Sequence, residues 1–408
     1  MRKNLVSIMS EKFIAEKIND IIAKWDKRIE GTDKNLVFEN LTFSSGLPGV
    51  ILLLLENDRE KNRQKAEEYI DYMVGIMSEK GILTDSLYSG AAGIGLSILP
   101  LVGNDNKYRL LQNSINEYID YSVGQRVINF EKNNVTPLDY DVIEGISGVL
   151  VYLLSIDDSN LDYLITKIVN FLLEVMEDDR EYIPFYVKSE NQLSKEESKI
   201  YPRGCLNMGV AHGIAGIGIV LAYSIRKGYG GRRARIVLRK IISLYEKFEL
   251  TDNLGKMWKD GIEEAEYKKQ KILFPPKHLR DAWCYGSPGI SLLYLYAGIV
   301  ENSKYLKDKA KFILLEAVQR RLGVDTWMLC HGEQGLIEIC SLFKKLLKVD
   351  LFDKYIKGYS SNSLSLKNEP PTFLEGSVGI ILSILHLEYG KNNTDWRHAL
   401  LLFEDFES

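Results

Sequence analysis

Cysteine is scarce in this chain, with four in 408 residues, which excludes the dense disulfide framework of a small secreted domain. The formal net charge is only −4, so the chain has no excess of positive charge with which to bind nucleic acid. No apolar run reaches the roughly 18 residues of a bilayer-spanning helix. These absences predict a cytosolic protein with reduced thiols that binds no nucleic acid and does not span a membrane.

The N-terminal segment lacks the features of a secretory signal. Residues 1–27 contain neither an apolar central region nor a small-residue cleavage site, and their pattern predicts an amphipathic helix. The overall composition, 45% hydrophobic and 26% charged, is ordinary for a globular protein.

A Gly-x-x-Gly motif recurs along the chain, and each copy opens an apolar segment. A single copy would mean little, but repetition is the signature of a repeat architecture. The seven copies are Gly46–Gly49, Gly90–Gly93, Gly145–Gly148, Gly213–Gly216, Gly286–Gly289, Gly332–Gly335 and Gly376–Gly379.

The segments that follow the glycines have the pattern of buried helices. Pro48 and Pro288 occupy the third motif position, which suits the first turn of a helix. The run 213–225 is apolar almost all round, and small glycines would let neighbouring helices approach closely. Between the motifs lie amphipathic stretches such as 238–245. The sequence therefore predicts an all-α fold, an α,α-toroid in which seven inner helices are wrapped by seven outer helices, over residues 1–408 as a single domain.

Two intervals between successive motifs are longer than the others. The intervals are 68 and 73 residues from Gly145 to Gly213 and from Gly213 to Gly286, whereas the rest are 44–55. The extra residues fall at about 180–203 and 248–280, where aromatic and polar residues alternate and turn signals occur. Since long insertions are often functional, we expect a small, partly β subdomain or lid over the active-site mouth.

The residue before each first glycine is polar, and inner helices running in one direction would place all seven at one end of the toroid. These residues are Ser45, Ser89, Glu144, His212, Tyr285, His331 and Glu375, and one step earlier lie Cys284 and Cys330. Half of the cysteines and two of only five histidines are thereby predicted to meet in one region.

Cys284, Cys330 and His331 have the donor atoms of a zinc site. Zinc favours thiolate and imidazole ligands, and three protein ligands leave a fourth position open, as in catalytic sites. The alternative is that both cysteines are small buried hydrophobic residues and that His331 caps a helix. The repeat register favours one catalytic zinc ion per chain.

His212 has the same register as His331 and is a candidate general acid or base. Asp141, which precedes its own helix by less than one turn, could orient the imidazole of His212. The alternatives are a histidine that is only hydrogen-bonded in the wall and an aspartate that only caps a helix.

The remaining polar residues of this register have simpler interpretations. Glu144 and Glu375 suit the positive end of a helix dipole. Arg280 is a candidate to pair with Asp141 or to bind substrate, with a surface ion pair as the alternative, and Tyr285 is a candidate hydrogen-bond donor. Cys205, Cys340, His278, His386 and His398 are expected to have no catalytic role.

Several strings strongly resemble the lanthionine cyclases of the LanC-like family. They are SLYSGAAGI, YDVIEGISG, GCLNMGVAHGIAGIG, RDAWCYGSPGISLLYLY, CHG and FLEGSVG, and the resemblance covers essentially the whole chain. It implies an α,α-toroid with an inserted SH2-like subdomain. By position, the family's zinc ligands fall on Cys284, Cys330 and His331, its acid/base pair on His212 and Asp141, and its site-lining residues on Arg280 and Tyr285.

The resemblance also implies a substrate and partners. The substrate is a ribosomal precursor peptide with a leader, in which Ser and Thr are already dehydrated; a dehydratase and a membrane exporter are partners by family analogy. A free thiol with a pKa of about 8.5 is mostly protonated at neutral pH, whereas a metal-bound thiol is deprotonated. The chemistry expected is Michael-type addition of cysteine sulfur to dehydroalanine or dehydrobutyrine, with His212 as the acid, which forms lanthionine and methyllanthionine rings.

Two other classes of protein remain open from the residues alone. A prenyltransferase-like zinc toroid would alkylate thiols but would need an aspartate ligand where this chain has a second thiol. A non-catalytic zinc- or thiol-binding peptide scaffold would need no acid/base pair, and the presence of His212 and Asp141 weighs against it.

Overall fold

The computed structural model describes residues 11–31, 37–103, 105–177, 182–358, 366 and 369–406. The chain divides into two compact units. Unit 1 draws on Met1–Thr84, Tyr88–Asn116 and Asp325–Trp396, and unit 2 on Asp85–Leu87, Glu117–Val324 and Arg397–Ser408.

Each of the seven motifs starts an α-helix whose N-cap is the first glycine, as predicted. These motif helices are α2 (Leu47–Glu56), α4 (Ala91–Val102), α6 (Ile146–Leu154), α9 (Ile214–Arg226), α12 (Ser287–Val300), α14 (Glu333–Leu347) and α16 (Ser377–Tyr389). All residues of α6 are buried, and so are those of α9 except Arg226. An apolar sequence with no polar face requires this burial.

The second glycine of the motif leaves room for the loop that precedes the same helix. A Cβ on Gly148 would lie 2.1 Å from the carbonyl oxygen of Val142, and one on Gly335 would lie 2.0 Å from that of Leu329. The same relation to the residue six positions earlier holds at Gly148, Gly216, Gly289, Gly335 and Gly379. A Cβ would also lie 2.6 Å from Cγ2 of Val142 at Gly216 and 2.7 Å from Cγ2 of Val210 at Gly289, in the loop of the preceding repeat. These glycines therefore make room both for the helix's own loop and for the neighbouring repeat.

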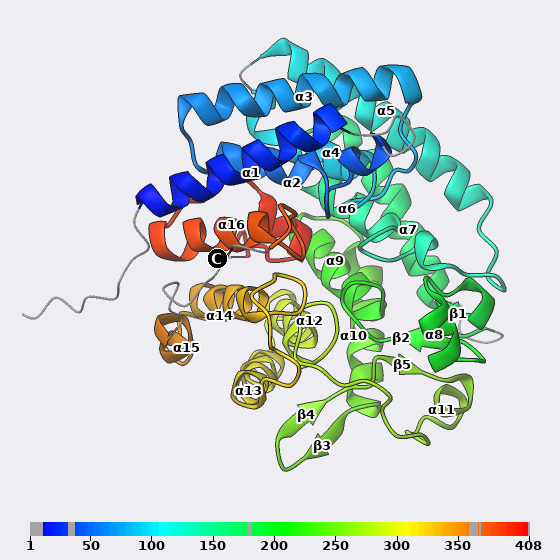
Figure 1. Cartoon of the computed structure of the whole chain (residues 1–408). Helices are drawn as coiled ribbons and strands as arrows, with labels where there is room; N and C mark the ends of the chain where they lie inside the picture. Colours follow the sequence, from blue (N-terminus) through cyan, green and yellow to red (C-terminus); the bar gives the residue numbers. More distant parts are fainter. Residues whose placement is uncertain are drawn as a thin grey trace, which may run out of the picture. The chain divides into compact units, whose positions relative to one another are not determined.

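An amphipathic helix precedes or follows each motif helix, as the pattern predicts. These helices are α1 (Glu11–Gly31), α3 (Glu60–Lys80), α5 (Asn106–Ile128), α7 (Asp162–Glu177), α10 (Gly231–Lys247), α13 (Lys304–Arg320) and α15 (Asp353–Gly358). In α10 the apolar stripe formed by Leu238, Ile241, Ile242 and Tyr245 is buried. Figure 1 shows α10 beside α9, and α13 contacts α12 in the same way.

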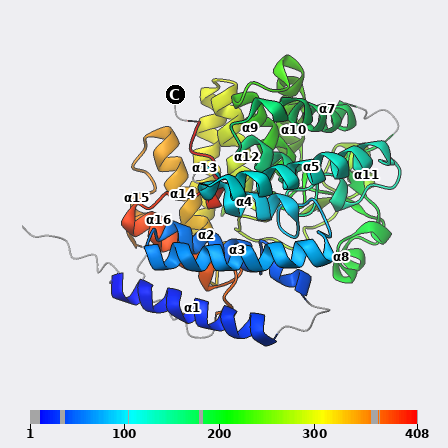
Figure 2. The same cartoon turned by 90° about the horizontal axis from the view of Figure 1, so that it is seen from above.

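In unit 1 the N-terminal helix α1 lies along α3 (Figure 2). The hydroxyl of Tyr69 on α3 donates to Asp26 on α1 at 2.9 Å, and Trp25 is fully buried. The amphipathic helix expected over residues 1–27 is thus present from Glu11 onward, while residues 1–10 lie outside the described part of the chain.

In unit 2 the two predicted insertions contribute to one small sheet. Strands β1 (Tyr186–Val187), β2 (Cys205–Asn207) and β5 (Gly261–Ile262) form an antiparallel sheet in the order β1-β2-β5. A hairpin of β3 (Leu250–Asp252) and β4 (Gly255–Met257) and two short helices, α8 (Lys195–Ile200) and α11 (Glu264–Lys269), complete this region. The partly β character is as expected; the boundaries of the subdomain and its role as a lid stay predictions.

A buried ion pair fastens the second insertion. The ammonium of Lys259 lies 2.7 and 2.8 Å from the two carboxylate oxygens of Glu266, and both side chains are fully buried. Glu266 also accepts hydrogen bonds from the backbone N–H groups of Glu263, Leu273 and Phe274. Buried charges need such complete pairing, since burial without it is costly.

The remaining helical turns are short 3₁₀ segments: η1 (Val37–Leu41), η2 (Pro137–Asp139), η3 (Ser159–Leu161), η4 (Ser189–Asn191) and η6 (Trp396–Leu400). Within the described residues, helices greatly outnumber strands, as an all-α fold requires. Among the described residues, no helix has the length and apolarity needed to cross a bilayer.

Candidate functional site

In each unit, backbone hydrogen bonds join the loops that precede the motif helices. In unit 2, Val142 N–H donates to the carbonyl of Ala211 at 3.1 Å, and Val210 N–H donates to that of Cys284 at 2.9 Å. In unit 1, Cys330 N–H donates to the carbonyl of Leu374, and Leu374 N–H donates to the carbonyl of Ser44, both at 3.2 Å. The predicted convergence of these loops therefore holds within each unit.

Asp141 and His212 form the most defined side-chain pair among these loops. Nδ1 of His212 lies 2.5 Å from Oδ2 of Asp141. The other carboxylate oxygen accepts from the backbone N–H groups of Glu144 at 2.6 Å and Gly145 at 2.8 Å. Asp141 thus fixes the loop that leads into α6 and holds the imidazole of His212, whereas the N-cap of α6 is Gly145, which has no side-chain capping bond.

The environment of His212 favours its protonated form. Burial lowers the pKa of His212, but the hydrogen bond and the negative charge of Asp141 raise this pKa by more, so it lies above the ordinary value. The side chain of His212 is 22% exposed, whereas that of Asp141 is fully buried. Because Nδ1 faces the carboxylate, Nε2 is the nitrogen left to exchange a proton.

Tyr285 lies beside His212, with 6.4 Å between the ring centroids. Its hydroxyl accepts a hydrogen bond from Nδ2 of Asn207 at 2.8 Å, and Oδ1 of Asn207 accepts from Gly209 N–H at 2.9 Å. Burial raises the pKa of Tyr285 well above its usual range, although the hydrogen bond from Asn207 opposes part of this rise. Tyr285 is therefore a neutral hydroxyl that can donate. Asn207 was missed in the sequence because it lies in β2, outside the repeated register.

Arg280 is exposed and makes no ion pair with Asp141, so that pairing is not found among the described residues; both oxygens of Asp141 are already occupied. Arg280 instead lines a cavity of about 200 Å³ together with Tyr285 and Glu197. Its position leaves a role in substrate binding open.

Cys284 lies in unit 2, directly before Tyr285, and is 6% exposed. Its carbonyl accepts from Val210 and Ala211, and the preceding Trp283 is buried and donates its indole N–H to the carbonyl of Leu400 at 2.7 Å. The backbone of Cys284 is therefore held on both sides.

Cys330 and His331 lie in unit 1, at the start of α14. Cys330 is 8% exposed, and the His331 side chain is 27% exposed. Nδ1 of His331 lies 3.9 Å from Oε1 of Glu375, a residue that the sequence had suggested only as a helix-start carboxylate. A carboxylate near the second nitrogen is a common partner of metal-binding histidines.

The donor set of Cys284, Cys330 and His331 could hold a metal ion. Two thiolates and one imidazole fit the preference of zinc. The three residues come from both units, and the geometry among them stays a prediction.

Of the other cysteines and histidines, Cys205 and His278 line the cavity that contains Tyr285, whereas Cys340, His386 and His398 lie outside it. None of the four cysteines forms a disulfide, and burial raises the pKa of Cys205 to about 12 and also raises that of Cys340. His386 pairs with Glu338 at 2.9 Å, and His398 lies 2.7 Å from the hydroxyl of Ser155. Among the described residues, neither Cys205 nor Cys340 belongs to the group of donor atoms that could hold a metal ion.

Comparison with known proteins gives concordant matches along the chain. The family model described as lanthionine synthetase C-like protein matches residues 37–401. The chain is 49% identical over 408 residues to the nisin biosynthesis protein NisC of Lactococcus lactis subsp. lactis, covering 98% of each chain. A solved structure of nisin cyclase matches with a TM-score of 0.92 and 48% identity, over 97% of this chain and 99% of the other, which confirms the predicted fold class.

Proposed function

This chain belongs to the lanthionine synthetase C-like family, and from that premise we propose how its own residues form thioether rings. The chain is a lanthionine cyclase, an enzyme that forms carbon–sulfur bonds in a precursor peptide. The observation that carries the mechanism is the buried Asp141, which holds His212 in the loop next to that of Cys284.

Cys284, Cys330 and His331 are the proposed ligands of one zinc ion. The support is the donor chemistry, the near-complete burial of both thiols and the carboxylate of Glu375 close to His331. When bound, zinc would supply a deprotonated substrate thiol at neutral pH, since metal coordination removes the thiol proton.

His212 is the proposed general acid. In the reaction the cysteine sulfur bonds to the β-carbon of dehydroalanine or dehydrobutyrine, the carbon–carbon double bond is lost, and the α-carbon needs a proton. Nε2 of His212 supplies this proton, and Asp141 stabilises the imidazolium and fixes the ring. No atom is gained or lost overall, because the thiol proton that leaves is balanced by the one delivered to carbon. General acid catalysis is worth about 10²–10⁴-fold.

Tyr285 and Arg280 are proposed to bind the reacting residue. The neutral phenol of Tyr285, fixed by Asn207, can donate to the carbonyl oxygen on which negative charge develops during addition. Arg280 lines the adjoining cavity and is proposed to bind peptide carbonyl groups there. Neither side chain needs to change its charge.

The proposed substrate is a dehydrated ribosomal precursor peptide that carries a leader. A dehydratase must act before this enzyme, because the acceptor double bonds arise from Ser and Thr. We place the chain in the cytoplasm, with a dehydratase and a membrane exporter as partners and peripheral membrane association only through them.

Ring formation can be measured by mass and by thiol content. The zinc-loaded chain is incubated with the dehydrated peptide, which is then alkylated with a thiol reagent. Ring closure leaves the mass of the peptide unchanged and removes its alkylatable cysteines.

Two variants make this assay specific. Cys284→Ala should leave the peptide thiols alkylatable, whereas Cys340→Ala, which removes a buried thiol outside the proposed ligand set, should retain ring formation. Persistence of thiols with the wild-type zinc-loaded chain and its cognate peptide would rule out the proposed function.

A further inference from the structure

One tight turn in unit 2 carries both Cys284 and Tyr285, the proposed metal ligand and the proposed hydrogen-bond donor. The ends of this turn are Asp281 and Gly286, whose backbones form an antiparallel bridge. Gly286 has a φ of +110°, and a Cβ there would lie 1.8 Å from the carbonyl oxygen of Arg280. The chain therefore reverses direction here, and whatever fixes the two ends of the turn also fixes the residues between them.

The guanidinium of Arg320, the last residue of α13, contacts both ends of this turn. Its Nε and Nη2 donate to the two carboxylate oxygens of Asp281 at 3.0 and 2.6 Å. Nη2 also donates to the hydroxyl of Ser287, the first residue of α12, at 2.9 Å. The turn is thus held at the residue where it begins and at the residue directly after its end.

The other side of the guanidinium contacts the β3–β4 hairpin of the second insertion. Nη1 of Arg320 donates to the carbonyl oxygens of Leu254 and Lys256, both at 3.3 Å. The carbonyl of Lys256 also accepts from the hydroxyl of Ser287 at 2.8 Å. A guanidinium has five N–H donors, and these contacts use all five. One side chain thereby joins the turn, α13 and the inserted hairpin.

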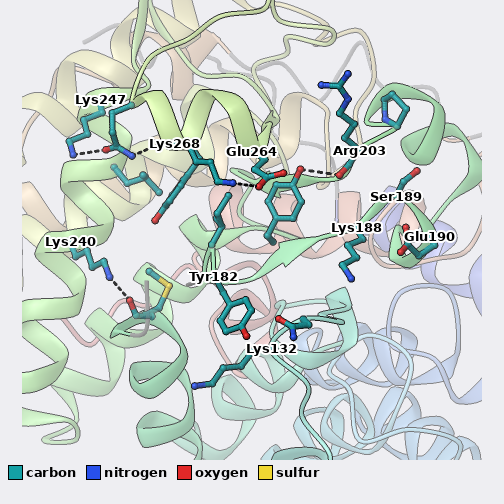
Figure 3. A pocket seen from close by; sticks show the side chains of 18 of the residues that line it. Lys132, Tyr182, Lys188, Ser189, Glu190, Arg203, Lys240, Lys247, Glu264 and Lys268 are labelled. Atoms are coloured by element: carbon teal, nitrogen blue, oxygen red, sulfur yellow. Dashed lines mark hydrogen bonds and ion pairs between the residues drawn. The ribbon is translucent and has the colours of Figure 1, made fainter. Parts of the chain in front are cut away.

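Burial distinguishes this ion pair from surface pairs of the same unit. The Asp281 side chain is fully buried and that of Arg320 is 4% exposed. In contrast, Lys268 and Glu264, which pair in the lining of the cavity of about 980 Å³ in Figure 3, are both exposed. Exposed pairs contribute little to stability, whereas loss of one partner of a buried pair leaves an uncompensated charge. The conformation of the turn should therefore depend on Arg320.

We propose that Arg320 is a positioning residue of the ring-forming reaction and acts through Asp281 to hold Cys284 and Tyr285 in place. This inference rests on the proposed function. Because both members of the ion pair are buried, their effect passes through the turn and not through contact with the peptide. A displacement of about 1 Å can cost about 10²-fold in rate, so the pair should matter chiefly for kcat.

The kinetic test is Arg320→Lys, which keeps the positive charge but loses the planar fork that contacts both carboxylate oxygens. We expect kcat of the zinc-loaded full-length chain to fall about 10- to 100-fold, with KM within about threefold of wild type. The matched control is Arg233→Lys, the same substitution in another pair of unit 2 in which an arginine contacts both oxygens of one carboxylate, that of Glu177. This control should keep the wild-type kcat.

Thiol reactivity separates positioning from general stability and requires no turnover. In the zinc-free chain, the alkylation rate of each cysteine is measured by mass spectrometry of its peptide. Arg320→Lys should speed alkylation of Cys284 about tenfold, the factor that corresponds to 1.4 kcal/mol, because the turn opens locally more often. Cys205 is buried in the same unit and should react at the wild-type rate. Ser287→Ala, which removes one acceptor of Arg320, should speed Cys284 by less.

Equal acceleration at Cys284 and Cys205 would overturn the inference, because Arg320 would then act on the stability of the whole unit. A wild-type kcat in Arg320→Lys, or an equal loss of kcat in Arg233→Lys, would also overturn it. If Arg320→Lys does not fold, the same comparisons with Ser287→Ala decide. Failure of the cyclase function is distinguishable, since the wild-type chain would then form no rings while the alkylation rates would still report on the turn.

Discussion

Replacement of Asp141 by asparagine tests the role of the His212 pair. Asparagine keeps an oxygen for the backbone N–H groups of Glu144 and Gly145, so the start of α6 should persist. It loses the charge that faces Nδ1 of His212 at 2.5 Å. A charge-assisted hydrogen bond is worth about 1.5–3 kcal/mol. If that stabilisation supports the imidazolium during proton transfer, kcat should fall about 10- to 150-fold.

The pH dependence should change in a defined direction. In the wild type, the raised pKa of His212 keeps the acid form populated at higher pH, and activity is lost as pH rises through this pKa. In Asp141→Asn the partner that raises the pKa is weakened while burial still lowers it. The descending limb of kcat against pH should therefore move to lower pH.

The assay is single-turnover alkylation of the peptide over a pH series, with zinc content and thermal unfolding measured in parallel. Asp139→Asn is the matched control, because Asp139 carries the same charge but bonds with Thr136 in the same loop. If Asp141→Asn binds zinc, stays folded and keeps the wild-type kcat and the wild-type descending limb of kcat against pH, His212 is not the general acid.

Further predictions concern stability, measured by denaturant titration. Gly335→Ala would place a Cβ 2.0 Å from the carbonyl oxygen of Leu329, and this overpacking should lower the free energy of unfolding by about 1–3 kcal/mol. Gly75 lies on α3 with open space around it, so Gly75→Ala should raise the free energy of unfolding by about 0.5–1 kcal/mol. Lys259→Met leaves the buried carboxylate of Glu266 without its cation and should destabilise the inserted region by about 3–5 kcal/mol, measured by hydrogen exchange of β5 and α11. Equal stability of Gly335→Ala and Gly75→Ala, or unchanged exchange in Lys259→Met, would contradict these expectations.

The fold could be predicted from the sequence because the same short motif starts a helix in every repeat. Every first glycine of a motif is an N-cap, and within each unit backbone hydrogen bonds join loops that carry the polar residue before that glycine. Asp141 and His212 are 71 positions apart, yet the shared register predicted their meeting. Because the repeats place equivalent residues in equivalent loops, the sequence predicts contacts between residues that are far apart along the chain.

Features outside the repeat could not be predicted in this way. Asn207 donates a hydrogen bond to Tyr285 from strand β2, and the spacing of the repeated motif does not relate these two positions. The motif pattern shows where small residues are needed, but it does not show that the loop before the same helix is one of the neighbours that require them.

Zinc X-ray absorption of the full-length chain tests the central claim most directly. The account predicts one zinc ion with two sulfur ligands at about 2.3 Å and nitrogen or oxygen ligands at about 2.0–2.1 Å, one sulfur fewer or no bound zinc in Cys284→Ala, and an unchanged spectrum in Cys205→Ala. A first shell without sulfur, or a Cys284→Ala spectrum identical to that of the wild type, would contradict it.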